Sequence, residues 1–364
     1  MILSSVIITL SITAVLATIA SLFKHDVWWI RIFDFPRVQI SVFTSFMFAA
    51  LLSVFEKNIF WHYVLGISLL GCIGYQLKKI FPYTRLAKKQ VLNTPRSKET
   101  STISILAANV LTPNRRVSDL LKIIKANSPD IVLTVETDKW WEQQLCSLEA
   151  QYTYTVKKPL DNLYGMHLYS KLELVEPEVK FLVEENIPSI HATIKLRNKQ
   201  QVKLYCLHPA PPSPTENETT TERDAELLMV AKHIKEHDKT AIVTGDLNDV
   251  AWSDTTILFQ KISGLLDPRI GRGFFNTFHA KYFFIRWPLD HIFHSSDFTL
   301  VSIKRLPYFG SDHFPIFAEL NHEPRAECFQ AEPEAKMADR KLAEEKIEKA
   351  EADERKLENN HGTA

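Results

Sequence analysis

The residues with the clearest chemical potential stand where a short apolar run of this sequence stops at a glycine. Residues 241–243 lead to Gly245, and a carboxylate, Asp246, and a carboxamide, Asn248, follow two residues apart. Glycine permits close approach of another chain or a ligand, and alternate residues of an extended chain point the same way. An acid and an amide displayed in this way suit the binding of a phosphate group together with its metal ion.

Polar residues also follow other apolar runs, at positions that read as the ends of strands. The set consists of Asn109, Glu136, His208, Asp246, Asn248, Asp290, Asp312 and His313. Taken singly, Asn109 could cap a turn, Glu136 could cap the next helix and His208 could be a core histidine. Strand ends on one side of a sandwich converge in space, however, so the set as a whole indicates a functional site.

The segments that must position these residues read mostly as β-strands with helices between them. Strands are predicted at residues 102–109, 131–135, 152–156, 164–169, 172–175, 189–196, 201–207, 241–243, 289–294, 298–306 and 314–320. Helices are predicted at 116–127, 220–236 and 253–261. Because strands outnumber helices, the pattern favours an α+β fold, a two-sheet β-sandwich flanked by helices, over a doubly wound parallel sheet.

Several short motifs contain the polar set, in a fixed order along the chain. They are Asn109, Val135-Glu136-Thr137, Tyr164-Gly165, Leu207-His208-Pro209, Gly245-Asp246-Leu247-Asn248, Pro288-Leu289-Asp290-His291 and Ser311-Asp312-His313-Phe314-Pro315. Their order and content resemble the endonuclease/exonuclease/phosphatase superfamily, which implies a deoxyribonuclease I-like fold. The resemblance covers about residues 103–320.

The resemblance also implies a metal site. Glu136 would be the main ligand of a divalent ion, Mg²⁺ or alternatively Mn²⁺, which are hard cations suited to carboxylate and phosphate oxygens. Asn109 and Asp312 would assist at the metal. Some relatives carry an acid two residues after the asparagine, where this chain has Leu111. We therefore expect one strongly held ion.

The remaining members of the set would carry the reaction that the resemblance implies, in-line attack of water on phosphorus. Asp246 would orient or deprotonate the water, and Asn248 would hold the phosphate. His313 would act at the phosphoryl group, with Asp290 fixing its tautomer and His208 as the second imidazole. The implied activity is that of a metal-dependent phosphodiester hydrolase, a nuclease or a phosphodiesterase.

Two features bear on the substrate, which we expect to be either a nucleic acid or a phospholipid headgroup. The chain has 43 basic and 43 acidic residues, so no net charge draws it to nucleic acid. An apolar N-terminal region favours a phosphodiester close to a membrane. The alternative to an enzyme is a catalytically silent membrane scaffold that binds a protein partner through its charged C-terminal helix.

The N-terminal region contains three apolar stretches long enough to be membrane helices, at residues 1–23, 38–55 and 59–77. Basic residues gather after the first and third stretches, whereas the short turn between the second and third contains only Lys57. By the positive-inside rule the globular domain is cytoplasmic, and the N-terminus and the turn lie outside. We expect a multi-pass protein of the bacterial inner membrane, in contact with the lipid bilayer.

The chain therefore divides into four parts. Residues 1–80 form a transmembrane region of three helices, 81–101 a basic linker along the membrane surface, and 102–322 the catalytic domain. Residues 323–364 form a charged tail that is either a solvated helix or disordered. The four cysteines are widely spaced without a CxxC pair, which indicates neither a zinc site nor a disulfide framework.

Overall fold

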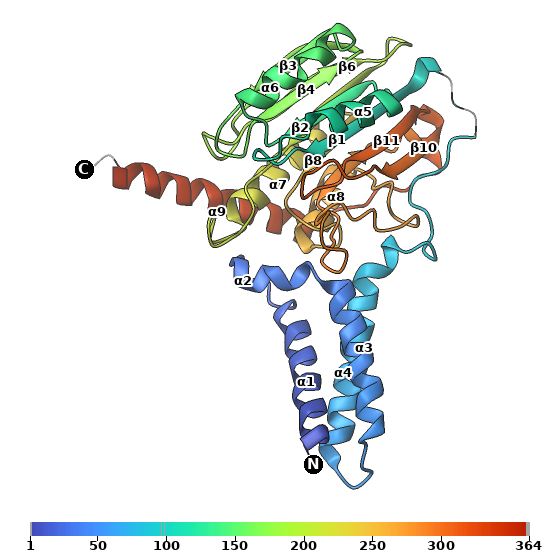
Figure 1. Ribbon diagram of the computed structural model, residues 1–364, viewed down its shortest axis with the longest axis vertical. Coiled ribbons are helices and arrows are strands. Elements are labelled where there is room, and N and C mark those ends of the chain that lie inside the picture. The colour runs from blue at the N-terminus through green and yellow to red at the C-terminus, as the bar shows by residue number, and fades with distance from the viewer. Residues whose placement is uncertain (1, 96, 98, 362–364) are drawn as a thin grey trace.

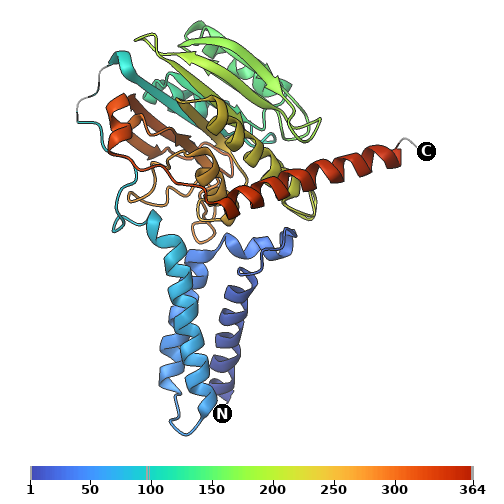
Figure 2. The same cartoon turned by 180° about the vertical axis from the view of Figure 1, so that it is seen from behind.

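The computed structural model joins a bundle of apolar helices to a larger α+β domain (Figure 1). It describes residues 2–95, 97 and 99–361. Outside the description lie Met1 of the first predicted span, Arg96 and Lys98 of the predicted linker, and residues 362–364 of the predicted tail. The apolar helices extend from one end of the domain, and the C-terminal helix projects to one side of it (Figures 1 and 2).

The domain is built on two mixed β-sheets, as the strand-rich pattern predicts. The first sheet has the order β10-β11-β1-β2-β4-β3, with β1 (Thr102–Asn109), β2 (Ile131–Val135), β3 (Tyr154–Lys158), β4 (Met166–Ser170), β10 (Phe298–Arg305) and β11 (Ile316–His322). The second has the order β5-β6-β7-β8-β9, with β5 (Glu173–Lys180), β6 (Ser189–Lys195), β7 (Gln201–Leu207), β8 (Ala241–Asp246) and β9 (Asp290–His294).

A continuous apolar core lies between the two sheets. Alternate residues of β1, such as Ile103 and Ile105, meet alternate residues of β7, such as Leu204 and Cys206. All four are fully buried. Burial of one such side chain stabilises the fold by roughly 1.5–3 kcal/mol. The two-residue period of the strands thus turns one face of each sheet inward and fixes the register.

Helices cover the outer face of each sheet. The first sheet is covered by α5 (Val117–Asn127) and α6 (Lys139–Leu145), and the second by α7 (Thr221–His237) and α8 (Asp254–Ser263), on which α9 (Met337–His361) packs. Short 3₁₀ turns occur at η3 (Glu99–Ser101), η4 (Cys146–Ala150) and η5 (Pro324–Cys328). The first turns of α9 pack on α7 through Ala343, so this part of the tail is not solvated as the sequence suggests.

The apolar region consists of α1 (Ile2–Ala20), α3 (Arg37–Ser53) and α4 (Phe60–Ile80), with α2 (Trp28–Arg31), η1 (Ile32–Asp34) and η2 (Phe81–Tyr83) near the domain. Two helical segments, Ile2–Ala20 and Phe60–Tyr83, are long and apolar enough to cross a membrane. Helix α3 reaches that length only together with α2 and η1, from which it is bent by 71°. The structure thus supports two spans directly and a third only through this bent pair.

The segment predicted to be a linker is ordered against the domain. Tyr83 and Val91 are buried, and Tyr83 donates a hydrogen bond to the Ala251 carbonyl. The Thr94 N–H donates to the Leu300 carbonyl. The expectation of a tether along the membrane surface is therefore wrong for these residues, because apolar side chains within the basic segment complete the domain core.

Candidate active site

The site lies where two parallel strand pairs end. In the first sheet β1 runs parallel to β2, with Asn109 opposite Val135, and in the second β7 runs parallel to β8, with Leu207 opposite Gly245. Parallel neighbours finish at the same edge of a sheet, so the residues that follow them emerge together. The polar set predicted from the sequence begins at these ends.

Asn109 connects the two sheets. Its Nδ2 donates hydrogen bonds to Glu136 Oε1 at 2.6 Å and to Asp246 Oδ2 at 3.1 Å, and its Oδ1 accepts one from the Leu111 N–H at 3.0 Å. The prediction that Asn109 assists at the metal stays a prediction, and in this geometry its amide reaches the proposed ligand Glu136 directly. The amide thus holds two carboxylates side by side.

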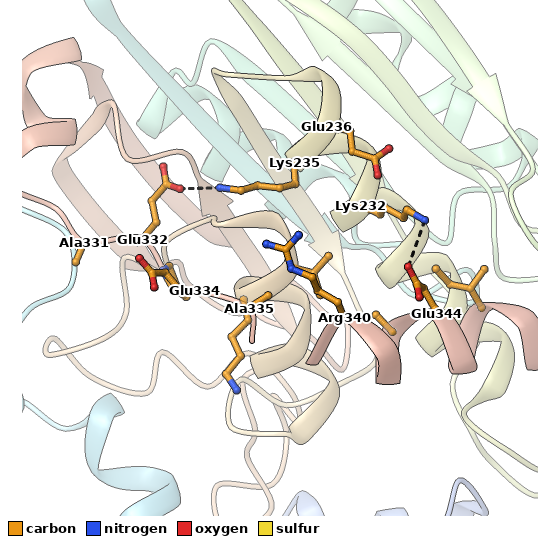
Figure 3. A pocket seen from close by; sticks show the side chains of 14 residues that line it. Lys232, Lys235, Glu236, Ala331, Glu332, Glu334, Ala335, Arg340 and Glu344 are labelled. Carbon is orange, nitrogen blue, oxygen red and sulfur yellow. Dashed lines mark hydrogen bonds and ion pairs between the residues drawn. The ribbon is translucent and has the colours of Figure 1, made fainter. Parts of the chain in front are cut away.

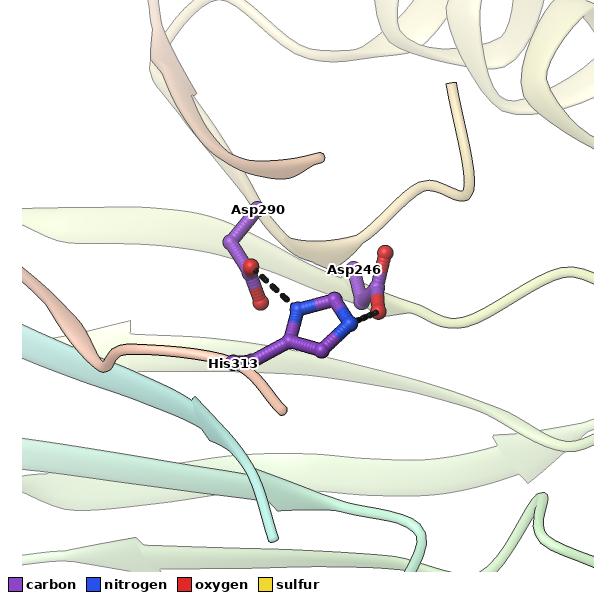
Figure 4. Close-up of side chains that lie close together, drawn as sticks. All are labelled: Asp246, Asp290 and His313. Carbon is purple, nitrogen blue, oxygen red and sulfur yellow. Dashed lines mark hydrogen bonds and ion pairs between the residues drawn. The ribbon is translucent and has the colours of Figure 1, made fainter. Parts of the chain in front are cut away.

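His313 lies between two buried carboxylates (Figure 4). Its Nδ1 is 2.8 Å from Asp290 Oδ2, and its Nε2 is 3.4 Å from Asp246 Oδ2. Asp246 and Asp290 stand opposite each other in the register of β8 and β9, which brings both to one imidazole. The predicted Asp290–His313 pair is thus present in the structure.

The protonation states follow from this arrangement. Burial alone would lower the pKa of His313, but Asp246 and Asp290 together raise it to about 10. Burial lowers the pKa of His208 to about 4, although nearby Asp246 opposes the shift. Burial raises the pKa of Glu136 to about 7, with neighbouring Asp312 and Asp246 adding to the rise. At neutral pH the site therefore holds one imidazolium, one neutral imidazole and a readily titrated carboxyl group.

Two positions in the site offer ligands to a divalent ion. Ligand atoms of Asp246, Asp290 and His313 lie within 4.8 Å of one another. An ion bound there would have to displace the proton that the raised pKa keeps on His313. Glu136 loses its proton more readily, since its pKa is about 7, and its buried Oε2 has no hydrogen-bond partner among the described residues. A carboxylate oxygen of this kind suits a hard cation.

The other predicted residues surround this centre. Asn248 donates from Nδ2 to the Pro209 carbonyl at 2.9 Å and from its backbone N–H to Asp246 Oδ1 at 3.0 Å. The ring of His208 lies 5.3 Å from that of Tyr164. Asp312 is partly exposed and accepts a hydrogen bond from Ser311 at 3.3 Å. These residues adjoin the centre without direct bonds to its imidazolium.

The backbone is strained at two of these strand ends. Glu136 has φ = 61° and Asn248 has φ = 51°, in the left-handed region that ordinary residues avoid. Gly245 has φ = 144°, and a Cβ there would lie 1.9 Å from the Leu207 carbonyl oxygen. The glycine is therefore required where β8 passes the end of β7. Strain of this kind persists only where the surrounding contacts enforce it.

Several supporting residues were not predicted from the sequence. The Thr277 hydroxyl accepts hydrogen bonds from the Leu289 and Asp290 N–H groups, and the Phe278 ring lies 5.0 Å from that of His313. The Ser311 hydroxyl donates to the Asn109 carbonyl at 2.8 Å. Thr277 and Phe278 lie in an irregular segment without periodicity, so no local signal marks them. Ser311 lies within a recognised motif, but its hydrogen bond joins it to Asn109, which is far away in the sequence.

A separate cavity of about 510 Å³ lies between α7, α8 and α9 (Figure 3). Two ion pairs form among its charged residues: Lys235 lies 3.0 Å from Glu332, and Lys232 lies 4.0 Å from Glu344. None of the predicted site residues lines it. This cavity belongs to the packing of the C-terminal helix.

Comparison with known proteins extends these findings. Residues 106–313, more than half of the chain, match the family described as "Endonuclease/Exonuclease/phosphatase family". A structure of D. rerio TDP2 complexed with single strand DNA product is 18% identical, covers 61% of this chain and 99% of its own, and has a TM-score of 0.51. The human Nocturnin catalytic domain with bound sulfate anion is 19% identical, with coverages of 62% and 95% and a TM-score of 0.51. At these identities the likeness concerns the fold, and no curated protein sequence matches the chain.

Proposed function

The chain belongs to the endonuclease/exonuclease/phosphatase family, and on this premise we propose that it is a membrane-anchored, metal-dependent phosphodiester hydrolase. The observation that carries the proposal is His313, held by Asp290 beside Asp246, close to a carboxylate with an unpartnered oxygen at Glu136. This arrangement favours an enzyme over a silent scaffold, because a buried ion-pair network and strained strand ends carry a cost in stability that packing alone does not require.

We assign the proton chemistry to Asp246 and His313. The pKa of Asp246 is lowered, since the charge of His313 outweighs burial, so Asp246 is ionised at neutral pH and available to orient and deprotonate the attacking water. The 3.4 Å distance between His313 Nε2 and Asp246 is too long for a strong hydrogen bond. The Nε2–H group of His313 is therefore available to donate a hydrogen bond to a phosphoryl oxygen of the substrate. Asp246 takes one proton from the water as the water oxygen bonds to phosphorus, one P–O ester bond breaks, and the leaving oxygen takes up a proton from solvent, so that the products are an alcohol and a phosphomonoester.

We assign the cation to Glu136, with Asp312 nearby and Asn109 positioning the carboxylate. Mg²⁺ or Mn²⁺ held there would neutralise charge on the phosphate. Asn248 would hold the phosphate, since the Pro209 carbonyl and Asp246 fix its orientation. His208, kept neutral by burial, would serve as the second imidazole.

The membrane part of the proposal is a three-span anchor. Helix α3 lies beside α4 and α1, and together they form one bundle (Figure 1). If α3 also crosses the membrane, the N-terminus and the turn at residues 54–59 lie on one side of the membrane and the domain lies on the other. The basic residues near the domain support the proposal that this side is the cytoplasmic side of a bacterial inner membrane.

Hydrolysis of bis(p-nitrophenyl) phosphate by the full-length protein in detergent tests the activity. We expect turnover with Mg²⁺ or Mn²⁺ and none with EDTA. Glu136→Gln should lose turnover and also the rise in melting temperature that Mg²⁺ gives the unaltered protein, since it removes the proposed ligand. Glu185→Gln, at an exposed glutamate, should retain both. A folded preparation without metal-dependent hydrolysis of this diester, nucleic acids or phospholipids would exclude the enzyme.

A further inference from the structure

An exposed aromatic loop, residues 280–286, lies between the catalytic domain and the apolar helices. Its Tyr282, Phe283 and Phe284 side chains are 49%, 78% and 59% exposed. Three consecutive exposed aromatic residues are unfavourable in water, and a contiguous apolar patch of this kind marks an interaction surface.

The aromatic loop is attached to the apolar helices. Gln39, in the first turn of α3, donates a hydrogen bond from Nε2 to the Phe284 carbonyl at 2.8 Å. The rings of Phe35 and Trp287, on either side of this contact, lie 5.6 Å apart. The loop therefore lies at the end of α3 that faces the domain. In a spanning helix that end is at the membrane interface, where aromatic rings are favoured.

Other exposed apolar residues lie at the same level. Trp29 on α2 is 57% exposed, Ile32 on η1 is 50% exposed and Phe81 at the end of α4 is 49% exposed. All belong to short segments that flank the domain-facing ends of the apolar helices (Figure 2). The aromatic loop thus adds to the exposed apolar residues on the segments that join the apolar helices to the domain.

The aromatic loop also leads directly into the catalytic centre. The Ala280 N–H, at its start, donates to the Asp312 carbonyl at 2.6 Å. Trp287, just after it, stacks on Phe278 with ring centroids 5.9 Å apart, and Phe278 in turn contacts His313. A displacement of the loop at the membrane surface would therefore shift the groups that contact the His313 ring.

Two arginines beside the site carry charge that no carboxylate balances. The guanidinium groups of Arg286 and Arg305 lie 5.0 and 4.3 Å from the ring of Phe314, the residue after His313. Both donate hydrogen bonds to backbone carbonyls, and neither forms an ion pair with an acid of the described residues. Unpaired guanidinium groups next to a phosphoryl-transfer site complement an anionic substrate.

We propose that the aromatic loop enters the interface of the bilayer and that the substrate is the phosphodiester of a lipid headgroup in that bilayer. The inference rests on the proposed function and names its substrate class. Exposed aromatics and arginines can also stack on single-stranded nucleic acid. The hydrogen bond from Gln39 favours the lipid, because it fixes the loop at the level of the headgroups, where a polynucleotide would meet the membrane surface.

The activity test uses the full-length protein in vesicles of phosphatidylethanolamine and phosphatidylglycerol, with released products followed by phosphorus NMR. The double variant Phe283→Ser/Phe284→Ser should lower lipid hydrolysis about tenfold or more, since it removes two apolar rings that the bilayer interface would bury. Its turnover of bis(p-nitrophenyl) phosphate should not change. Phe329→Ser, at a 77% exposed phenylalanine after η5, is the matched control and should behave as the unaltered protein.

A second measurement does not depend on activity. With the exposed Cys146 and Cys328 replaced by serine, Phe283→Cys is labelled with an environment-sensitive fluorophore and compared with Phe329→Cys. Emission from position 283 should shift to the blue in vesicles, and emission from position 329 should not.

Each outcome separates the two proposals. Hydrolysis of the soluble diester without hydrolysis of either phospholipid overturns the lipid substrate and leaves the proposed function standing. Loss of single-stranded DNA cleavage in the double variant, with no blue shift at position 283, identifies the loop as a nucleic-acid platform and also overturns the inference. Absence of all hydrolysis refutes the proposed function itself, and the label then still decides whether the loop contacts lipid.

Discussion

His313 is the residue whose protonation the fold changes most clearly within the site. Burial disfavours its charged form, yet the carboxylates of Asp246 and Asp290 raise its pKa to about 10, above the ordinary value of 6.5. The stabilisation from this pairing is fully present below pH 6.5 and is lost as the pH rises through about 10. Across the neutral range His313 is therefore a cation available to a phosphoryl oxygen.

Replacement of one carboxylate tests this account. Asp290→Asn should lower the pKa of His313 from about 10 towards its ordinary value and reduce turnover of bis(p-nitrophenyl) phosphate about 100-fold, within the usual range for acid–base residues. The pKa is measured by NMR titration of the His313 ring. Asp297→Asn is the control, because Asp297 lies 3.2 Å from His322 in another aspartate–histidine pair. An unchanged titration and rate in Asp290→Asn would show that Asp290 does not position His313.

At the scale of elements, the C-terminal helix reaches the site through buried charges. Lys346 on α9 lies 2.8 Å from Asp224 and 2.9 Å from Asp26, and so joins α7 to the segment before α2. Arg223 pairs with Asp224 and donates to the Asn248 carbonyl at 2.8 Å. A polar chain therefore runs from the tail to the strand end that carries Asp246.

Lys346→Met should lower the free energy of unfolding by about 1–3 kcal/mol, because it removes a donor from a buried carboxylate that still keeps Arg223. The pKa of Asp224 is depressed, since Arg223 and Lys346 outweigh its burial, so this stabilisation is present above pH 3.8 and is lost as the pH falls towards the lowered value. Urea unfolding at neutral pH gives the measurement. Lys349→Met, at a 46% exposed lysine on the same helix that also reaches Asp26, should cost less than about 1 kcal/mol. Equal effects of the two substitutions would contradict a role for the buried contact.

At the scale of the whole molecule, the domain is fixed to the apolar helices rather than tethered to them. Trp252 Nε1 donates to the Asp34 carbonyl at 2.8 Å, and Lys79 pairs with Asp254. Trp252 lies in the loop that follows Asn248, and Asp254 begins α8 directly after that loop. The catalytic end of the sandwich therefore faces the bundle, as the path of the chain in Figure 1 also shows.

Reporter fusions test the proposed topology. Green fluorescent protein at the C-terminus should fluoresce and alkaline phosphatase there should be inactive, because the first folds in the cytoplasm and the second needs an oxidising compartment. The same reporters fused after Asn58, in the turn between α3 and α4, should give the opposite pattern. Alkaline phosphatase activity at the C-terminus would place the domain outside the cytoplasm.

Much of the local structure could be predicted from sequence because it depends on near neighbours. The apolar periods of 102–109 and 131–135 coincide with β1 and β2, and the predicted helix 116–127 begins one residue before α5. The polar residues at strand ends could be selected for the same reason. Their type and their place after an apolar run are both visible in the chain itself. How those residues meet was not visible there.

Only the tertiary structure decided the partners. It placed the amide of Asn109 between two acids, showed that part of the basic segment before β1 completes the core, and brought Thr277 to the end of β9. Such contacts join residues far apart in sequence and depend on how sheets and loops pack, which no local pattern records. The sequence by itself thus determined which groups were available for catalysis. Packing determined which of them form hydrogen bonds, ion pairs or a common surface.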